Sequence, residues 1–373
     1  MLALVNTELK PFEDLASDFA AKELVQSTEQ QDQYPFGPFF DNILDKAYEV
    51  GLLGITLPEK LGGIGQGVST LCVILDHICR ADSSLGGIIF SNTFAQELIL
   101  CSGEDDLLAK SLVTAKNAHD FLFAVPSYCN PAETELIPVA TKEKKSYTLS
   151  GPIEYVVMAG MASHGIIPAR IGAQEDYSYF LVDMTDKGIL KSEPIVSLGL
   201  HACPACDLKL KKVKAELLGK QAHGPKYFSA ISDKLHVAAA AMSLGIMKGT
   251  FQEALAYTKE RRQGGREIIN WTEMSMILAN MAIRIKNAEM CVTQASLATD
   301  HKDPQWDLCS LAAALHVQKM ACDITTDGIQ VLGGNGYMKD YGQEKRYRDA
   351  KQVQALLGIT PLKKISYITR IKG

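Results

Sequence analysis

The residues best suited to chemistry lie near the C-terminus and at the end of a predicted helix. The sequence Gln-Val-Leu-Gly-Gly-Asn-Gly-Tyr at residues 330–337 ends one helix with Gly333 and Gly334. Glycine permits positive φ and a close backbone approach, either to a cofactor or only to a neighbouring helix. Arg261 ends another predicted helix just before a Gly-Gly pair. Its guanidinium suits a phosphate, although a solvated charge favoured by the helix dipole is the plain alternative.

Three further side chains carry acid or base groups near predicted helix starts. Asp233 and His236 lie at the start of the helix predicted at 235–260, where an aspartate is a common N-cap and a histidine is usually exposed or capping. Asp82 stands before a Ser-Ser pair at a helix junction, as an N-cap does. Such a carboxylate could also act as an acid or base, so a structural and a catalytic interpretation stay open.

The nine cysteines are scattered along the chain. The first residues show no basic segment and no small-residue cleavage site typical of a secretory signal, so we expect reduced thiols and a cytoplasmic protein. Cys203 and Cys206, with His201 nearby, resemble half of a zinc site. Zinc needs four ligands and no second pair lies close in the sequence, so no metal is expected.

The composition argues against two classes of function. With 38 Lys and Arg against 43 Asp and Glu, the formal net charge is −5, which disfavours non-specific nucleic-acid binding. The longest apolar candidate, residues 237–247, falls short of the roughly 20 residues that cross a bilayer, so no membrane span is expected. A hydrophobic fraction of 47% over 373 residues allows a large core in two or three domains.

The periodicity of apolar residues divides the chain into three regions. Residues 1–120 have helical spacing, 121–225 alternate with the period of two typical of strands, and 226–373 return to helical spacing. We therefore expect an α+β multidomain protein with an N-terminal helical domain, a middle β-barrel or β-sandwich domain and a C-terminal helical bundle. The expected strands are 147–151, 154–157, 178–182 and 207–211, and the expected helices are 68–80, 235–260, 272–300 and 305–331.

This order of regions, together with several short motifs, resembles the acyl-CoA dehydrogenase family. The motifs are the block at 330–337, Arg-Tyr-Arg-Asp-Ala-Lys at 346–351, Gly-Leu-Leu-Gly-Ile-Thr-Leu-Pro at 51–58, Leu-Ser-Gly at 149–151, Leu-Gly-Leu at 198–200 and Glu-Arg-Arg-Gln-Gly-Gly at 260–265. The resemblance covers essentially the whole chain. It implies FAD as the cofactor and a four-helix bundle as the C-terminal domain.

The resemblance also implies where FAD would bind. Arg261 corresponds to an arginine that reaches the pyrophosphate of the neighbouring subunit's FAD, although the aromatic residue of that Arg-x-x-Phe-Gly motif is missing here. Gln330, Gly333 and Gly334 correspond to residues that contact the adenylate half of the cofactor. This part of the family pattern is intact.

The flavin ring would meet the β domain, where the family pattern is altered. Tyr155 replaces a tryptophan and can still form an aromatic wall, although by itself it is an ordinary strand tyrosine. Ala124 and Val157 replace two threonines whose hydroxyls contact the ring. Only their backbone N–H groups remain as donors, so the redox tuning of the flavin is expected to differ.

The catalytic base of the family has no counterpart at its usual places. The family reaction removes a proton from the α-carbon of a CoA thioester with a glutamate and passes a hydride from the β-carbon to the flavin. The two positions known to carry that glutamate correspond to Leu357 and Leu235. Loss of a general base typically lowers the rate about 10²–10⁴-fold. Asp233 corresponds to a residue that binds the pantetheine arm of CoA, and His236 is a candidate substitute base.

Three functions fit these observations. The first is an FAD-dependent acyl-CoA dehydrogenase-like oxidoreductase that acts on the Cα–Cβ bond of an acyl-CoA thioester, with a relocated or absent base and an electron-transferring flavoprotein as acceptor. The second is a base-independent elimination on an acyl-CoA, such as desulfination or decarboxylation. The third is a non-catalytic subunit of a hetero-oligomeric acyl-CoA dehydrogenase. Either a homotetramer or a hetero-oligomer with a homologue is expected, because closed symmetric assembly is the usual form.

Overall fold

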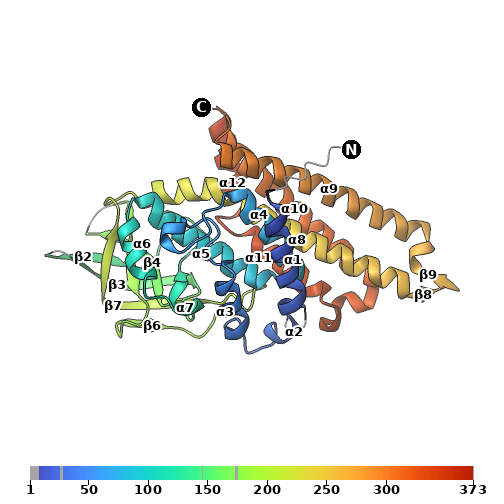
Figure 1. Cartoon of the computed structure of the whole chain (residues 1–373), viewed down its shortest axis with the longest axis horizontal. Coiled ribbons are helices and arrows are strands. Elements are labelled where there is room, and N and C mark those ends of the chain that lie inside the picture. The colour runs from blue at the N-terminus through green and yellow to red at the C-terminus, as the bar shows by residue number, and fades with distance from the viewer. Residues whose placement is uncertain (1–7, 26–27, 145, 173–174, 373) are drawn as a thin grey trace.

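The structure, a computed structural model, describes residues 8–25, 28–144, 146–172 and 175–372. In Figure 1 the β domain lies at one end of an elongated molecule, the N-terminal helices lie over its middle, and the long C-terminal helices extend to the other end. The predicted α+β fold class, with its order of helical, β and helical regions, is confirmed. The placing of domain boundaries at 120/121 and 225/226 remains a prediction.

The N-terminal region is built around α5, which is apolar on all sides. Nearly every residue of α5 is buried, because the helix packs against α4, α8 and β1. Asp82 precedes α5 and its Oδ1 accepts a hydrogen bond from the backbone N–H of Ser84 at 2.6 Å, so the capping interpretation of Asp82 is confirmed. The elements are α1 (Lys10–Phe19), η1 (Ala20–Leu24), α2 (Thr28–Gln31), α3 (Asp41–Glu49), η2 (Glu59–Leu61), α4 (Val68–Ala81), α5 (Ser83–Ser102), α6 (Asp105–Leu112) and α7 (Ala118–Phe121).

The strands of the middle region form one sheet that closes on itself. Its order is β1-β4-β2-β3-β7-β5, β6 pairs with β7, and the additional pairing of β4 with β5 completes the ring. The two predicted strands at 147–151 and 154–157 are one long strand, β3, with irregular register near Gly151 and again between Ile153 and Val156. The elements are β1 (Phe123–Ala124), η3 (Pro131–Glu133), β2 (Val139–Glu143), β3 (Ser146–Val157), β4 (His164–Ile171), β5 (Tyr177–Asp183), β6 (Ile189–Lys191) and β7 (Ala205–Leu218).

The C-terminal region is a bundle of long helices around α8. Alanines and glycines let α8 approach its neighbours closely: a Cβ atom at Gly245 or Gly249 would lie 2.4 Å from a backbone oxygen of α4. No helix in the described ranges is long and apolar enough to cross a membrane. The elements are α8 (Gly224–Glu260), β8 (Arg262–Gln263), β9 (Arg266–Glu267), η4 (Ile268–Asn270), α9 (Thr272–His301), α10 (Trp306–Leu332), η5 (Gly333–Tyr337), η6 (Lys339–Tyr341), α11 (Gln343–Gln354) and α12 (Thr360–Lys372).

The start of α8 differs from the prediction. The helix begins at Gly224, eleven residues before the predicted start at Leu235. A proline in its first turn supplies the start signal, since proline is favoured at the first helical position. Asp233 and His236 therefore lie inside the helix. The N-cap interpretation of Asp233 and the exposed or capping interpretation of His236 are both wrong.

A turn between α11 and α12 carries Leu357, and a buried lysine holds that turn. Lys363 Nζ donates to Gln354 O at 3.0 Å, to Leu356 O at 3.1 Å and to Gln318 Oε1 at 3.1 Å. The ammonium thus satisfies carbonyl oxygens at the C-terminal end of α11 and links them to α10.

Replacement of this lysine tests how the turn is held. Lys363→Met keeps most of the apolar stem but leaves its buried acceptors without their donor. We expect the free energy of unfolding to fall by about 3 kcal/mol, as for loss of hydrogen bonds from a charged group. Lys364→Met, at the exposed neighbouring position, is the matched control and should change the stability little. Equal effects in urea denaturation would contradict a role of Lys363 in the turn.

Candidate functional site

Gln330, Gly333 and Gly334 lie on an exposed turn at one end of the helical bundle. α10 ends at Leu332, and the two glycines begin the turn that follows. A Cβ atom built on either glycine would meet no atom of the described residues within 4 Å, so among these residues the backbone is open to a ligand on that side. Gln330, on the last turn of α10, is also exposed.

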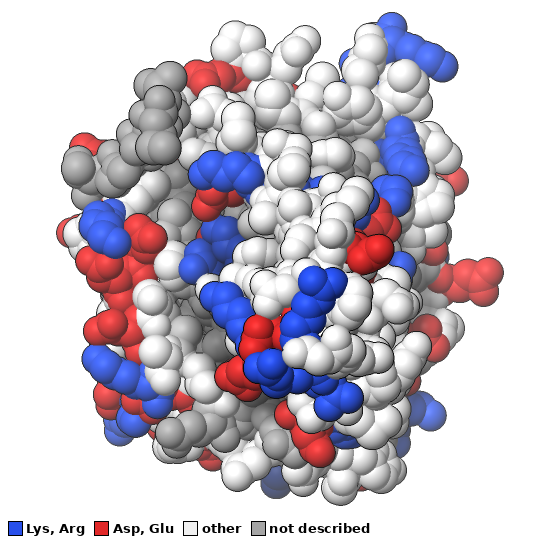
Figure 2. Space-filling model, turned by 90° about the vertical axis from the view of Figure 1, so that its right-hand side faces the viewer, with Lys and Arg blue, Asp and Glu red and all other residues white. Residues whose placement is uncertain are grey.

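The end of α8 lies beside this turn. Asn335 Nδ2 donates to Tyr257 Oη at 3.1 Å, and Tyr257 lies about one helical turn before Arg261. Arg261 follows the last residue of α8 and is exposed. Figure 2 looks onto this end of the molecule, where Lys, Arg, Asp and Glu side chains surround a hollow. We call Arg261, Gln330, Gly333 and Gly334 the bundle-end cluster; their role in cofactor binding remains a prediction.

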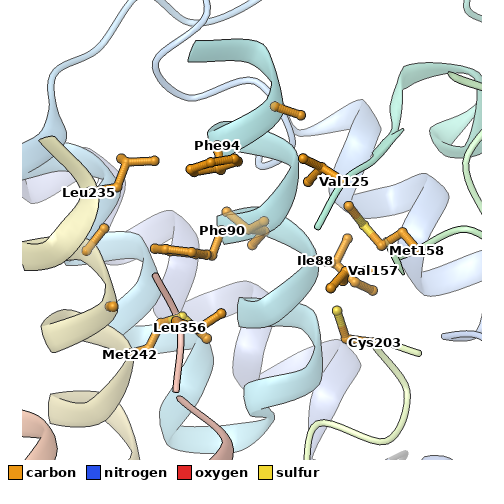
Figure 3. Close-up of a cluster of buried hydrophobic side chains, with 14 of the residues drawn as sticks. Ile88, Phe90, Phe94, Val125, Val157, Met158, Cys203, Leu235, Met242 and Leu356 are labelled. Atoms are coloured by element: carbon orange, nitrogen blue, oxygen red, sulfur yellow. The ribbon is translucent and has the colours of Figure 1, made fainter. Parts of the chain in front are cut away.

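The remaining predicted site residues lie toward the other end of α8. Leu235 and Glu260 are 25 positions apart on this one helix, which corresponds to about 38 Å at 1.5 Å per residue. Figure 3 shows Leu235 in a cluster of buried side chains that also contains Val125 and Val157 of the β domain. The structure therefore separates the residues predicted for the adenylate half of FAD from those predicted for its ring.

The backbone donors on the ring side bond within the chain. Val125 N–H donates to Val157 O, and Val157 N–H donates to Val125 O, both at 3.1 Å. Ala124 and Val157 are buried, at 0% and 1% exposure. The sequence predicts that the backbone N–H of Val157 donates to a flavin ring. In the structure this N–H donates to Val125 O instead.

Tyr155 is more than an ordinary strand residue. It has a φ of +55°, and its backbone N–H donates to Asp207 Oδ1 at 3.0 Å. Its hydroxyl accepts from Gln352 Nε2 of α11 at 2.7 Å, and its ring meets that of Tyr128 edge-on, with centroids 5.1 Å apart. Tyr128 and Gln352 carry no sequence pattern that marks them, because their contacts join distant parts of the chain.

Both positions of the family base are buried leucines. Leu235 is fully buried and Leu357 is 4% exposed. Figure 3 shows Leu235 near aromatic residues of α5, including Phe90 and Phe94, with Leu356 in the same cluster. The backbone N–H of Leu357 donates to Ser127 O at 3.1 Å. Neither leucine side chain can accept a proton.

A small cavity of about 140 Å³ lies on the other side of Leu357. His236 lines it and is 4% exposed; its Nδ1 has no hydrogen-bond partner among the residues that the structure describes. Burial, assisted by the charges of Lys363 and Arg370, lowers the pKa of His236 to about 3. His236 is therefore neutral at physiological pH and a weak proton acceptor.

The other titratable groups at this cavity are weaker candidates for a base. Asp233 pairs with Arg370, with 2.7 Å between Oδ1 and the nearest guanidinium nitrogen. Burial raises its pKa, which Arg370 opposes. Glu133, which the sequence did not single out, also lines the cavity; partial burial raises its pKa, but the side chain is exposed at the cavity mouth. The pantetheine role of Asp233 remains a prediction.

The residues of the cysteine motif, His201, Cys203 and Cys206, are all buried. His201 Nδ1 lies 2.7 Å from Asp32 Oδ1, and its ring stacks on Phe36 with centroids 3.6 Å apart. No group of three or more His, Cys, Asp or Glu residues within the described ranges is placed to hold a metal ion. Cys203 and Cys206 are buried.

A larger crevice, of about 610 Å³, lies between α1, η1, the end of α4, α8 and α11. Charged side chains line it, but several of them already have partners. Lys345 pairs with Asp349 at 2.7 Å, and Arg80 pairs with Asp76 at 3.0 Å. None of the residues predicted for cofactor or substrate lies in this crevice.

Comparison with known proteins decides the family. Residues 6–115 match the family model described as acyl-CoA dehydrogenase, N-terminal domain. Residues 229–362 match the one described as acyl-CoA dehydrogenase, C-terminal domain. The two matches together cover more than half of the chain. The chain belongs to the acyl-CoA dehydrogenase family. The predicted flavoprotein oxidoreductase class, with FAD as the cofactor of the family, is confirmed.

Similar proteins span the whole fold. The caffeyl-CoA reductase-Etf complex subunit CarC of Acetobacterium woodii is 28% identical over 354 residues, 92% of either chain. Butyryl-CoA dehydrogenase from Megasphaera elsdenii shares the fold with a TM-score of 0.89 at 22% identity, with 98% of both chains covered. A chain from an FAD complex of PigA has a TM-score of 0.87 at 17% identity and covers 100% of this chain and 99% of its own.

FAD fits one half of this chain's site and not the other. The bundle-end cluster offers an open glycine backbone and an exposed guanidinium, which suit the adenylate and pyrophosphate part. On the ring side Ala124 and Val157 are buried, neither carries a hydroxyl, and the N–H group of Val157 is already bonded to Val125 O.

The buried histidine predicts an acid-sensitive stability. Between pH 6.5 and pH 3 the unfolded chain binds a proton at His236 that the folded chain excludes, so stability falls as the pH falls through this window. On going from pH 7.5 to pH 5, His236 should account for about 2 kcal/mol of the lost unfolding free energy. His236→Gln removes the titration and should reduce the loss by that amount in urea denaturation. An equal loss in both proteins would contradict a neutral buried His236.

Proposed function

We propose that this chain is a subunit of an FAD-dependent oxidoreductase that acts on the Cα–Cβ bond of an acyl-CoA thioester, and that a homologous partner subunit carries the catalytic glutamate. One observation carries the proposal: both family base positions are buried leucines, Leu235 at 0% and Leu357 at 4% exposure. Removal of an α-proton needs an accepting group within hydrogen-bond reach of the substrate carbon's proton. A leucine cannot take that role.

The groups near the leucines do not replace the glutamate well. His236 has a pKa of about 3, so it accepts a proton far less readily than an unperturbed histidine. Asp82 caps α5 and lies 3.9 Å from the Lys345 ammonium. Glu133 is exposed at the mouth of a cavity of about 140 Å³, which is small for a thioester substrate. These facts favour an absent base over a relocated one.

The bundle-end cluster supplies this subunit's part of an FAD site. Arg261 would bind the pyrophosphate, and Gln330, Gly333 and Gly334 would contact the adenylate half. α8 ends just before Arg261, about 38 Å along the helix from Leu235. The flavin ring of an FAD that binds this cluster by its adenylate half is therefore held by the partner subunit. Such an FAD site is composed of residues from two chains.

Exposed apolar side chains support assembly with a partner. On α9, Met276, Ile283 and Met290 repeat every seven residues and are each about 60% exposed. The face of α12 adds further large apolar residues, Ile365, Ile368 and Ile371. Contiguous exposed apolar surface is typical of protein interfaces. A homologous subunit with the same helices is the partner that we infer.

An electron-transferring flavoprotein is the proposed redox partner of the assembly. The relative CarC belongs by name to a caffeyl-CoA reductase-Etf complex. Because the family includes a reductase of this kind and a butyryl-CoA dehydrogenase, the proposal covers either direction of electron flow.

Anaerobic flavin bleaching tests the proposal. The chain should be purified alone with added FAD, and in complex with each homologous subunit of the same organism, and mixed with a panel of acyl-CoA thioesters. We expect bleaching only in a complex. Replacement of the partner's catalytic glutamate by glutamine should slow bleaching about 10²–10⁴-fold.

A matched substitution in this chain provides the control. Glu133→Gln removes the carboxylate at the small cavity and should leave the bleaching rate of the complex unchanged. Bleaching by the chain alone that is lost in Glu133→Gln would show a relocated base and would sink the proposal.

A further inference from the structure

We propose that this chain closes its own flavin-ring position with Tyr128, Tyr155, Gln352 and the backbone that joins Ser127 to Leu357. The inference rests on the proposed function, because it requires that the complex of this chain with its homologous partner binds FAD. It adds that this chain never holds an isoalloxazine ring, so a pair of homologous subunits shares a single FAD. We call these contacts the ring lock.

The outer part of the ring lock joins three elements by side chains. Tyr155 comes from β3, Tyr128 from the segment after β1, and Gln352 from α11. Gln352 Nε2 donates to Tyr155 Oη at 2.7 Å, and the two tyrosine rings meet edge-on at 5.1 Å. Both tyrosines also pack against the hydrophobic core. Tyr155, the residue predicted to flank a flavin ring, thus contacts Gln352 and Tyr128 of the same chain.

The inner part of the ring lock is backbone. Leu357 N–H donates to Ser127 O at 3.1 Å, and Gly358 N–H donates to Tyr128 O at 2.7 Å. A planar ring held between two segments keeps them about 7 Å apart, twice the optimal carbon–carbon separation of about 3.5 Å. Two direct backbone hydrogen bonds leave no such space. The segment after β1, which carries the residues predicted to meet the ring, is thus bonded directly to the turn before α12, and a ring stacked between the two would have to break these bonds.

Three residues in or near the ring lock have positive φ angles, which indicates that surrounding contacts hold the backbone in this conformation. Tyr155, Met158 and Leu357 have φ values of +55°, +60° and +60°. For residues with a side chain this region costs roughly 1–2 kcal/mol each, so it persists only where surrounding contacts hold it. Here each N–H group is bonded: Tyr155 to Asp207, Met158 to Pro204 O, and Leu357 to Ser127 O.

Amide hydrogen exchange reads the inner part of the ring lock directly. The exchange of the Leu357 and Gly358 amides should be measured by mass spectrometry in the chain alone, with and without a large excess of FAD, and in the flavin-containing complex. We expect slow exchange in all three samples, with no change on adding FAD. A ring that enters would break both bonds, so an FAD-dependent rise in exchange, or a lasting change in the complex, would overturn the inference.

A second measurement tests the half of the cofactor site that stays open. Gly334 has ordinary φ and open space around it, so Gly334→Leu should fold but intrude on bound FAD. We expect the Kd of the complex for FAD to rise at least about tenfold, equal to about 1.4 kcal/mol. Gly37→Leu, at another glycine with ordinary φ and no atom within 4 Å of its Cβ position, is the matched control and should leave the Kd unchanged.

The outcomes separate the two proposals. Unchanged exchange with a weakened Kd in Gly334→Leu supports both the ring lock and the shared FAD. FAD-dependent exchange at Leu357 and Gly358 defeats the ring lock even where a partner glutamate drives bleaching. If no homologue forms a flavin-containing complex, the proposed function fails, while exchange in the chain alone still decides whether its ring position is closed.

Discussion

Two backbone hydrogen bonds, from Leu357 to Ser127 and from Gly358 to Tyr128, join the segment after β1 to the C-terminal helices. They hold the turn before α12 against the segment after β1, and Lys363 secures the same turn from the other side. The apolar cluster around Leu235 then fills the space behind. Where the family has polar groups for a flavin and a substrate, this chain thus has packed apolar side chains rather than an empty pocket.

The length of α8 sets the second constraint. The helix carries Leu235 in the apolar cluster and ends beside the bundle-end cluster about 38 Å away, so the two halves of the family's cofactor site cannot meet within one chain. The residues predicted for the adenylate half, Gln330, Gly333 and Gly334, match the family pattern, while alanine, valine and two leucines stand at the positions predicted for the ring and the base. This asymmetry fits a subunit that completes a partner's site.

The sequence was sufficient for the elements whose signals are local. The helix predicted at 68–80 and the order of the three regions follow from apolar spacing, and α4 (Val68–Ala81) agrees with it closely. The start of α8 was missed because the apolar pattern strengthens at Leu235, although the Gly-Pro pair that begins the helix lies upstream. Gln352 could not be found, since it meets Tyr155 across 197 positions of sequence. Contacts of that kind depend on tertiary packing and leave no local pattern.

The central claim is that this chain contributes to one shared FAD and closes its own ring position. Native mass spectrometry of the intact complex with its homologous subunit counts chains and cofactors in one spectrum. The account predicts one FAD for each pair of unlike chains. Two FAD molecules per pair would show that this chain holds a flavin ring of its own, and would contradict the account.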